Sequence, residues 1–445
     1  MAPQIPRGAV YRVRHPKWAL ERLYADTLAR SSGYILLTTL VTAVLGFGYW
    51  VIAARAYPSP SVGTAAVSVS VMTLASLLSG LGTTAAPVQR IPERRRGREW
   101  NVTVTVGVVV GGLAGLVAGM ISWAVMISIY PGEGLRSPHY ALALVAGVAL
   151  TNCSMVLDSV WVVERSAQIR LLTNTALSVV KLPLLLLPLL HAGGAVGIQF
   201  GWTAGVAVAV LLSLVLLARK RHYRLAIRGF WAEARTMRRS LTGNFIVNVG
   251  TNVPTYAVPV VVGAVVTASN TAYFYSAWRV GSLFFVGTAA VTTALFAEGS
   301  RDPRAAIRKA ERAMLVVIPI LLLATGMLAL LGPATLVAFG SEYRQHGFPL
   351  LLFLIGATIP DALTAVYRTV LRLQGRYFQA SCFMWGLAVL QIGLTALLLP
   401  IWGITGAGAA WFFAESVGVV YSAIDRLWVR YHPRSSGGKA SGANG

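Results

Sequence analysis

Long apolar runs separated by short polar segments dominate this chain. Twelve runs are long enough to cross a bilayer as helices, for which about 20 mostly apolar residues are needed. We expect membrane spans at approximately 33–54, 62–89, 101–129, 139–163, 171–190, 195–218, 241–266, 271–297, 313–331, 348–371, 377–399 and 404–427. The pattern predicts an all-α polytopic membrane protein. The first run is too long for a signal-peptide core, so we expect it to be retained.

The charge distribution sets the expected orientation of these helices. Of the 38 Lys and Arg residues, 32 fall on segments that are cytoplasmic if the N-terminus is inside, 3 on outer loops and 3 within spans. Because Lys and Arg concentrate on cytoplasmic loops, we expect both termini in the cytoplasm and the protein in the cell (plasma or inner) membrane. The net charge of +23 then represents loop charge that also attracts anionic lipid, and no nucleic-acid partner is expected.

The composition supports the membrane class and excludes several kinds of function. Hydrophobic residues make up 56% of the chain and charged residues only 12%, against about 25% charged in soluble domains. Cys153 and Cys382 fall in apolar segments and suggest neither a disulfide framework nor a metal site. The chain contains no GxxxxGK[ST] motif, no segment large enough for a cytoplasmic ATPase and no histidine in mid-span. We expect no cofactor, and coupling to an ion, the membrane potential or a downhill substrate.

The longest inner loop divides the chain into two halves of six spans each. Residues 219–240 are basic and predict an amphipathic helix on the inner leaflet, with Leu225, Phe230 and Trp231 turned toward lipid. The expected domains are a cytoplasmic arm at 1–32, an N-terminal lobe at 33–218, this linker, a C-terminal lobe at 241–428 and a disordered cytoplasmic tail at 429–445.

The two halves resemble each other, which indicates an internal repeat. They share an acid followed seven residues later by an arginine, and a tryptophan after a glycine-rich stretch: Asp158–Arg165 and Asp361–Arg368, and Trp202 and Trp411. On a helix, a spacing of seven residues puts both charged side chains on one face. Two repeated halves around a central cavity are typical of secondary transporters.

Arg279 is the most informative charge inside a predicted span, because such charges are costly in a membrane. It lies about 12 Å from the outer end of the eighth span at 1.5 Å per residue, which is too deep for easy snorkelling. Tyr275 and Ser276 extend the same polar face. The alternative to a substrate-binding role is a structural one, with the guanidinium satisfied by carbonyl groups or a carboxylate.

Lys181 and Glu415 are two further charges near the middle of spans. Pro183 and Pro188 follow Lys181 and can open the fifth span, which frees main-chain carbonyls. Lys181 is either a substrate-binding cation or half of a structural pair. Glu415 is the only deep carboxylate of the twelfth span. It is either structural, as the partner of Lys181 or another cation, or part of ion coupling.

Asp158 and Asp361 lie a turn or two from the predicted cytoplasmic ends of their helices. Each either pairs with its own arginine, Arg165 or Arg368, or takes part in an inner gate. The two arginines lie near headgroup depth, where snorkelling is the default explanation. These four residues and Glu415 are the candidates for gating or ion coupling.

The seventh span carries polar side chains on one face. Asn244, Asn248, Asn252 and Thr255 recur at helical spacing. Amides are expensive in lipid, so packing of small polar residues explains this face less well than a water-filled cavity does. We expect a cavity between the halves, lined by the first, second, seventh and eighth spans, with Arg279 inside it.

Three stretches carry a resemblance to a known superfamily: GFGYWVIAARAYPSPSVGTAAVSVS (46–70), SGLGTTAAPVQRIPE (79–93) and AYFYSAWRVGSL (272–283). The chain resembles the MOP superfamily of exporters (multidrug, oligosaccharidyl-lipid, polysaccharide), and within it the bacterial oligosaccharide flippase branch. The first stretch resembles that branch's ARxxxPxxVG pattern around Arg55, Pro58 and Gly63, with Pro58 one position earlier than in the pattern. The resemblance covers nearly the whole chain, but its motifs are diffuse and none is catalytic.

The resemblance implies two lobes that alternate between inward- and outward-open states. The implied activity is not enzymatic: a glycan on polyprenyl pyrophosphate would be moved to the outer leaflet for cell-surface polysaccharide biosynthesis. Arg279 would then bind the pyrophosphate as a planar, permanently charged fork, and the asparagine face would bond sugar hydroxyls. The implied partners are a polysaccharide polymerase and glycosyltransferases, and the transporter itself is expected to be a monomer.

Two other functions compete with this one. A drug or small-solute cation antiporter of the MATE type needs a buried carboxylate at the cavity, but its usual acid in the first or seventh span is absent from 33–54 and 241–266. A polytopic glycosyltransferase or polymerase needs outward carboxylates or a large outer loop, and the longest outer loop, 332–347, offers only Glu342. The peptidoglycan-precursor branch generally has two further C-terminal spans, which this sequence lacks.

Overall fold

The computed structural model describes residues 27–80, 83–93, 97–130, 133–237, 243–282 and 329–431, together with 318–319, 322–323 and 325–327. Most of the predicted N-terminal arm, residues 283–317 of the predicted eighth and ninth spans, and the tail after Tyr431 lie outside these residues. The described part of the chain is almost entirely helical and contains no strand.

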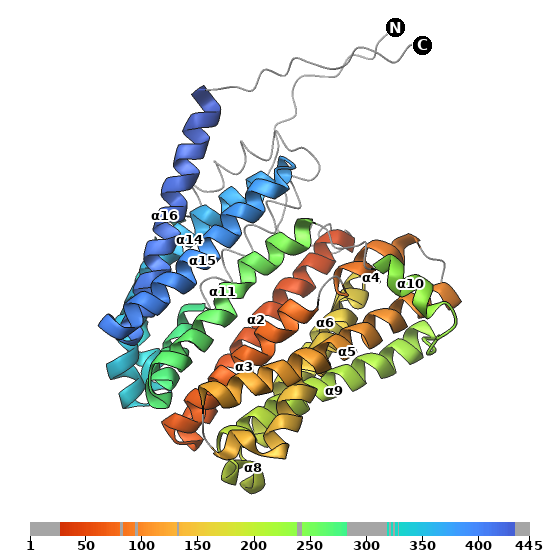
Figure 1. The fold of residues 1–445 in the computed structure, drawn as a ribbon, viewed down its shortest axis with the longest axis horizontal. Coiled ribbons are helices and arrows are strands. Elements are labelled where there is room, and N and C mark those ends of the chain that lie inside the picture. Colours follow the sequence, from red (N-terminus) through yellow and green to blue (C-terminus); the bar gives the residue numbers. More distant parts are fainter. Residues whose placement is uncertain are drawn as a thin grey trace, which may run out of the picture.

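The helices are named as in Figure 1. They are α2 (Thr27–Ala56), α3 (Ser59–Ser79), α4 (Ala85–Arg90), α5 (Arg98–Ile129), α6 (Pro138–Val163), α7 (Ala167–Leu184), α8 (Pro188–Ala192), α9 (Ala195–Arg221), α10 (Phe230–Met237), α11 (Gly243–Val265), α14 (Ser341–Leu373), α15 (Tyr377–Trp402) and α16 (Ile404–Tyr431), with short 3₁₀ turns at Ile91–Glu93 and Glu133–Arg136. Residues 268–282 are also helical.

Eight of the described helices are long and apolar enough to cross a membrane, and they correspond to eight of the predicted spans. They are α2, α3, α5, α6, α9, α14, α15 and α16. In α11 the apolar stretch is shorter, Val249–Val265. An all-helical membrane protein is therefore confirmed.

Two predicted spans are interrupted in the structure. The predicted helix at 62–89 ends at Ser79, and the chain becomes helical again at Ala85. The predicted helix at 171–190 ends at Leu184, where Leu185, Leu186 and Leu187 each donate to the carbonyl three residues earlier. The next helix begins at Pro188, because proline has no N–H to continue the earlier bonding pattern.

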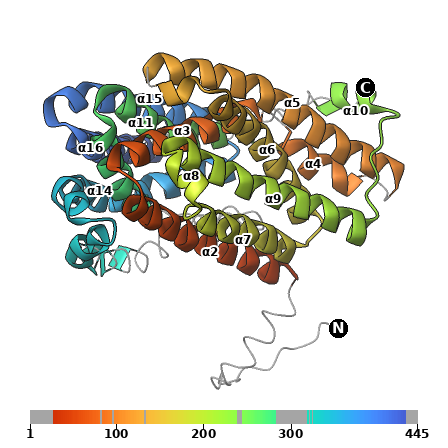
Figure 2. The same cartoon turned by 90° about the horizontal axis from the view of Figure 1, so that it is seen from below.

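The helices form two groups. In one, α5 packs on α6, α6 on α9, and α7 between α2 and α9; Figure 2 shows α2 and α7 side by side. In the other, α16 packs on α14 and α15, and α15 packs on α11. The packing of α11 on α3 joins the groups (Figure 1). A buried cluster of aromatic and aliphatic side chains, including Trp50, Ala65, Phe274, Trp278 and Leu350, extends across both groups.

Matching turns end α6 and α14 and correct the predicted repeat. The N–H of Ser166 donates to Trp161 O and that of Arg376 to Leu371 O, each at 2.9 Å, so both helices close with a Schellman turn. Arg165, with φ 53°, takes the left-handed position that Gly375 takes in the second turn. Asp158 lies seven residues before Arg165, and Arg368 lies seven residues before Gly375. The position equivalent to Asp158 in the second half is therefore Arg368, so the two acid–arginine pairs do not occupy equivalent positions.

Candidate functional site

Lys181 lies at the centre of an aromatic cage in the N-terminal half. Its side chain is only 3% exposed. The ammonium nitrogen lies 3.7 Å from the ring centre of Trp202 and 5.0 Å from that of Tyr49. Within the described residues it has no acidic partner, so the aromatic rings alone compensate its charge. Three helices build the cage: α7 supplies the lysine, α9 the tryptophan and α2 the tyrosine.

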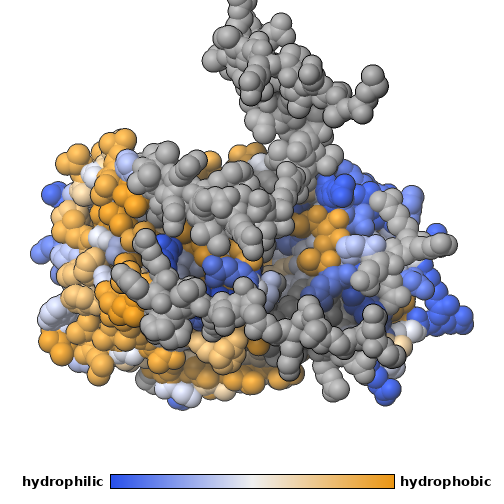
Figure 3. Space-filling model, turned by 90° about the horizontal axis from the view of Figure 1, so that it is seen from above, coloured by the Kyte–Doolittle hydropathy of each residue, from blue (hydrophilic) through white to orange (hydrophobic). Residues whose placement is uncertain are grey.

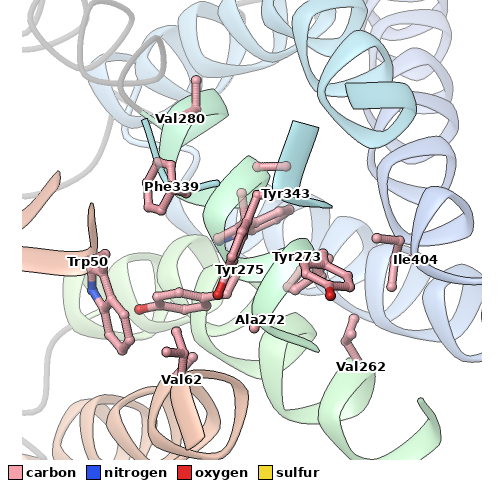
Figure 4. Close-up of a cluster of buried hydrophobic side chains, with 14 of the residues drawn as sticks. Trp50, Val62, Val262, Ala272, Tyr273, Tyr275, Val280, Phe339, Tyr343 and Ile404 are labelled. Atoms are coloured by element: carbon pink, nitrogen blue, oxygen red, sulfur yellow. The ribbon is translucent and has the colours of Figure 1, made fainter. Parts of the chain in front are cut away.

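Trp50 connects this cage to Arg279. The Trp50 ring lies 6.0 Å from Trp202 and 4.7 Å from Tyr275, and Figure 4 shows Tyr275 extending toward it. The guanidinium of Arg279 lies 5.7 Å from the Tyr275 ring. One aromatic row therefore runs from a cation in the first half of the chain to a cation in the second half.

The polar groups along this row include two cations, Lys181 and Arg279, and one hydrogen-bond donor, the Trp50 indole N–H. Arg279 forms no salt bridge with any acid in the described ranges, and it is close enough to Lys181 for the two charges to interact. The indole N–H of Trp50 is buried and has no hydrogen-bond partner among the residues that the structure describes. We call Lys181, Trp50 and Arg279 the cationic row. Two cations and an unused donor suit an anionic ligand and do not stabilise the fold by themselves.

The two halves are also in contact near one end of the long helices, where α2 ends and α3 begins. Arg55 in α2 donates to the main-chain oxygens of Ala338 at 2.8 Å and Val337 at 2.6 Å. A Cβ on Gly63 would collide with the main-chain oxygen of Ala268, so only glycine permits this approach. Burial raises the pKa of Tyr130, beside Gly263, to about 12. Positive-inside counting predicts that this closed end faces outward.

A cavity of about 480 Å³, lined by both polar and apolar residues, lies nearer the opposite end of these helices. Asp158, Arg170, Asn252 and Tyr256 are among its lining residues, which come from α3, α4, α6, α7 and α11. Figure 3 views the molecule from the end where α4 and α10 lie, and it shows hydrophilic residues in the middle of this face and at one edge, beside apolar flanks. The cavity thus combines hydroxyl, amide and ionic groups from both halves of the chain.

The acids do not have the partners that the sequence suggested. Asp158 bonds Arg170 at 3.3 Å and Asn174 at 3.1 Å. Arg165 lies beyond the end of α6 and is exposed, so its predicted pairing with Asp158 on one helix face is wrong. In α14, Asp361 and Arg368 do share one helix and lie close enough to interact.

Glu415 and Lys181 are not paired. Glu415 is 4% exposed and bonds Thr364 at 2.6 Å and Gln391 at 2.8 Å. These partners belong to α14 and α15, whereas Lys181 lies in the N-terminal half. Asp361 and Arg368 are the charged groups that act electrostatically on Glu415.

The remaining predicted residues contribute differently. Ser276 donates to Ala272 O in its own helix at 3.0 Å, and Thr255 is half-buried in α11. The side chains of Asn244 and Asn248 lie outside those that the structure describes. Sequence reasoning missed the cage residue Tyr49 and the connecting residue Trp50, because an aromatic residue in an apolar span carries no local signal of a cation nearby.

A protein family model described as "Polysaccharide biosynthesis protein" matches residues 28–296. No curated protein matches the chain significantly by sequence.

Solved structures with a similar fold include transporters of the MOP superfamily. An inward-facing multidrug resistance MATE family transporter aligns with a TM-score of 0.69 and 18% identity, covering 89% of this chain and 96% of that one. The lipid II flippase MurJ, in an inward closed conformation, aligns with a TM-score of 0.70 and 13% identity, covering 88% and 87%. A MOP superfamily transporter from Pyrococcus furiosus aligns with a TM-score of 0.61 and 17% identity, covering 91% and 96%. At these identities the similarity shows the fold alone.

Proposed function

Because the chain belongs to the polysaccharide biosynthesis protein family, whose model matches residues 28–296, we propose that it is a flippase for lipid-linked oligosaccharide. The cargo is a glycan on polyprenyl pyrophosphate, carried from the cytoplasmic to the outer leaflet by alternating access and used for cell-surface polysaccharide. The protein would work as a monomer beside a polymerase and glycosyltransferases, without enzymatic activity of its own.

The cationic row is the observation that carries this proposal. Lys181 and Arg279 come from opposite halves of the chain and have no acidic partner within the described ranges. A pyrophosphate brings the negative charge and acceptor oxygens that these two cations and the Trp50 N–H lack. The cavity that contains Asn252 would receive the sugar, because its amide, hydroxyl and ionic groups can bond sugar hydroxyls.

The cargo also fits the expected architecture. We propose twelve transmembrane helices in two lobes of six, in a bacterial inner membrane, with both termini on the cytoplasmic side. The contacts made by Arg55 and Gly63 would close the outer side in this conformation, while the cationic row receives the cargo from the inner side. The lipid tail would remain in the bilayer between the lobes.

An antiporter of drugs or small cations is the second candidate, because the chain has carboxylates within its helices: the buried Glu415 in the C-terminal half and the half-buried Asp158, which lines the cavity. The similar fold of a MATE family transporter agrees with it. The cationic row opposes this candidate, since two uncompensated positive charges repel a cationic drug.

The proposal is tested by the leaflet location of polyprenyl-pyrophosphate glycan in cells that lack the protein. We expect the glycan to accumulate in the cytoplasmic leaflet, and wild type and the exposed-site control Arg136→Ala to restore its export. Arg279→Ala should fold normally and fail to restore export. Restoration by Arg279→Ala would leave the flippase function but refute the pyrophosphate site, and absence of any accumulation would favour the antiporter.

A further inference from the structure

Glu415 is a buried acid in the middle of a membrane-spanning helix, and among the described residues its hydrogen-bond partners are uncharged. Its carboxyl oxygens contact the Thr364 hydroxyl at 2.6 Å and the Gln391 side-chain amide at 2.8 Å. All three side chains are at most 4% exposed. A carboxylate is costly in such surroundings unless a cation bonds to it.

The cation that acts electrostatically on Glu415 forms no hydrogen bond with it in the described part of the chain. Arg368, one of the charged groups that act on Glu415, directs a guanidinium nitrogen to Met384 Sδ at 3.3 Å. Asp361, on the same helix α14, adds negative charge to the surroundings. The helices α11 and α15 contain no acidic or basic residue. Within the ranges that the structure describes, therefore, no cation is hydrogen-bonded to the Glu415 carboxyl, and the Asp361 charge opposes that of Arg368.

The number of hydrogens available for bonding around Glu415 gives an independent indication that it carries a proton. The Thr364 oxygen lies 2.6 Å from Glu415 Oε2 and 2.9 Å from the main-chain oxygen of Asp361. A hydroxyl has one hydrogen, so it serves only one of these acceptors well. If Glu415 carries a proton on Oε2, it donates to Thr364, Thr364 donates to Asp361 O, and the Gln391 amide donates to Oε1. The Glu415 proton, the Thr364 hydroxyl and one N–H of the Gln391 amide then each have one acceptor.

We propose that Glu415 is a proton-binding site that is occupied in this conformation. Its reaction is the dissociation of the carboxylic acid into carboxylate and a proton, which passes to water. Dissociation would create a negative charge among α14, α15 and α16 and favour a conformation in which water or the Arg368 guanidinium reaches it. The site would couple transport to protons. This inference goes beyond the proposed function and depends only on the geometry of the C-terminal half, whatever the cargo is.

Infrared spectroscopy of the purified protein in lipid nanodiscs tests the proposal without any cargo. The wild-type protein should show the carbonyl band of a protonated carboxylic acid at neutral pH, and isotopic labelling of glutamate should shift it. The band should disappear in one step as the pH rises. It should be absent in Glu415→Gln, which keeps the shape of the side chain.

Asp425→Asn is the matched control in the same helix. Asp425 is bonded to Arg376 at 3.2 Å and Gln379 at 2.9 Å, so it should be ionised and contribute no band. Thr364→Val should keep the band but raise its frequency, because it removes the acceptor; this variant also serves if Glu415→Gln fails to fold. A wild-type spectrum without the band at neutral pH, a band that persists in Glu415→Gln, or a band unmoved by Thr364→Val would each overturn the proposal.

Discussion

Lys181 illustrates how a single residue can be costly to the fold and still be useful. Burial of a lone cation costs several kcal/mol in the absence of a counter-charge. Interaction with the Trp202 and Tyr49 rings returns about 2 kcal/mol, so the cage only partly offsets this cost. The charge of Lys181 is therefore only partly compensated, and a bound anion would supply the missing negative charge.

Substitution of Lys181 by methionine separates the two effects. Lys181→Met keeps an apolar stem in the cage and removes the charge, so we expect an equal or higher Tm. The loss of one charged hydrogen bond of about 1.5–3 kcal/mol should weaken binding of the pyrophosphate cargo, by roughly ten- to a hundredfold. Thermal unfolding and cargo titration measure the two quantities. Lys181→Arg is the control that keeps the charge; cargo binding unaffected by the methionine would contradict the role of Lys181.

Residue pairing is the level at which the sequence was least informative. The spacing of Asp158 and Arg165 suggested one helix face, but α6 ends at Val163 and the acid bonds Arg170 and Asn174 instead. The partner therefore comes from the next helix, and no periodicity within one helix reveals it. The same reason hid the cage, which is assembled from α2, α7 and α9.

At the level of elements, the stretch ARAYPSPSVG (54–63) has a physical explanation. Arg55 at the end of α2 caps the last carbonyls of the helical segment before Phe339, where the helix dipole favours a cation. Pro58 precedes the first turn of α3. Gly63 allows the main chain near Ala268 to approach. These three residues thus serve one short connection that holds the two halves together.

Removal of the Arg55 cap should shift the molecule toward the state in which this end is open. Two exposed hydrogen bonds from a charged donor contribute about 1–2 kcal/mol in total, which changes a two-state ratio by a factor of roughly 5–30. Spin labels at Thr64 and Gln345, with Cys153 and Cys382 replaced by serine, report the distance across the contact. We expect Arg55→Ala to increase the population with the longer distance and Arg136→Ala to leave it unchanged. The same distance distribution in both variants would contradict the cap.

For the whole molecule, hydropathy predicted the helices well, because burial in lipid depends on local composition. All eight membrane-length helices overlap predicted spans. Hydropathy did not show the breaks after Ser79 and Leu184, because those depend on hydrogen bonding at individual turns. Hydropathy also did not show which residues of the two halves are equivalent. That equivalence follows from the main-chain geometry of the matching turns at Arg165 and Gly375.

The orientation of the whole molecule remains a prediction, and cysteine accessibility can test it. In a chain without native cysteines, a membrane-impermeant thiol reagent should label Arg136→Cys and Gln345→Cys in intact cells. It should reach Gly229→Cys and Ala305→Cys only after permeabilisation, because these positions lie in basic segments that are retained in the cytoplasm. Ala305 is the decisive position: its protection requires that the chain cross the membrane once between α11 and residue 305 and again before α14. Labelling of Ala305→Cys in intact cells would refute the count of twelve spans, and labelling of Gly229→Cys would invert the orientation and place the Arg55 contact on the cytoplasmic side.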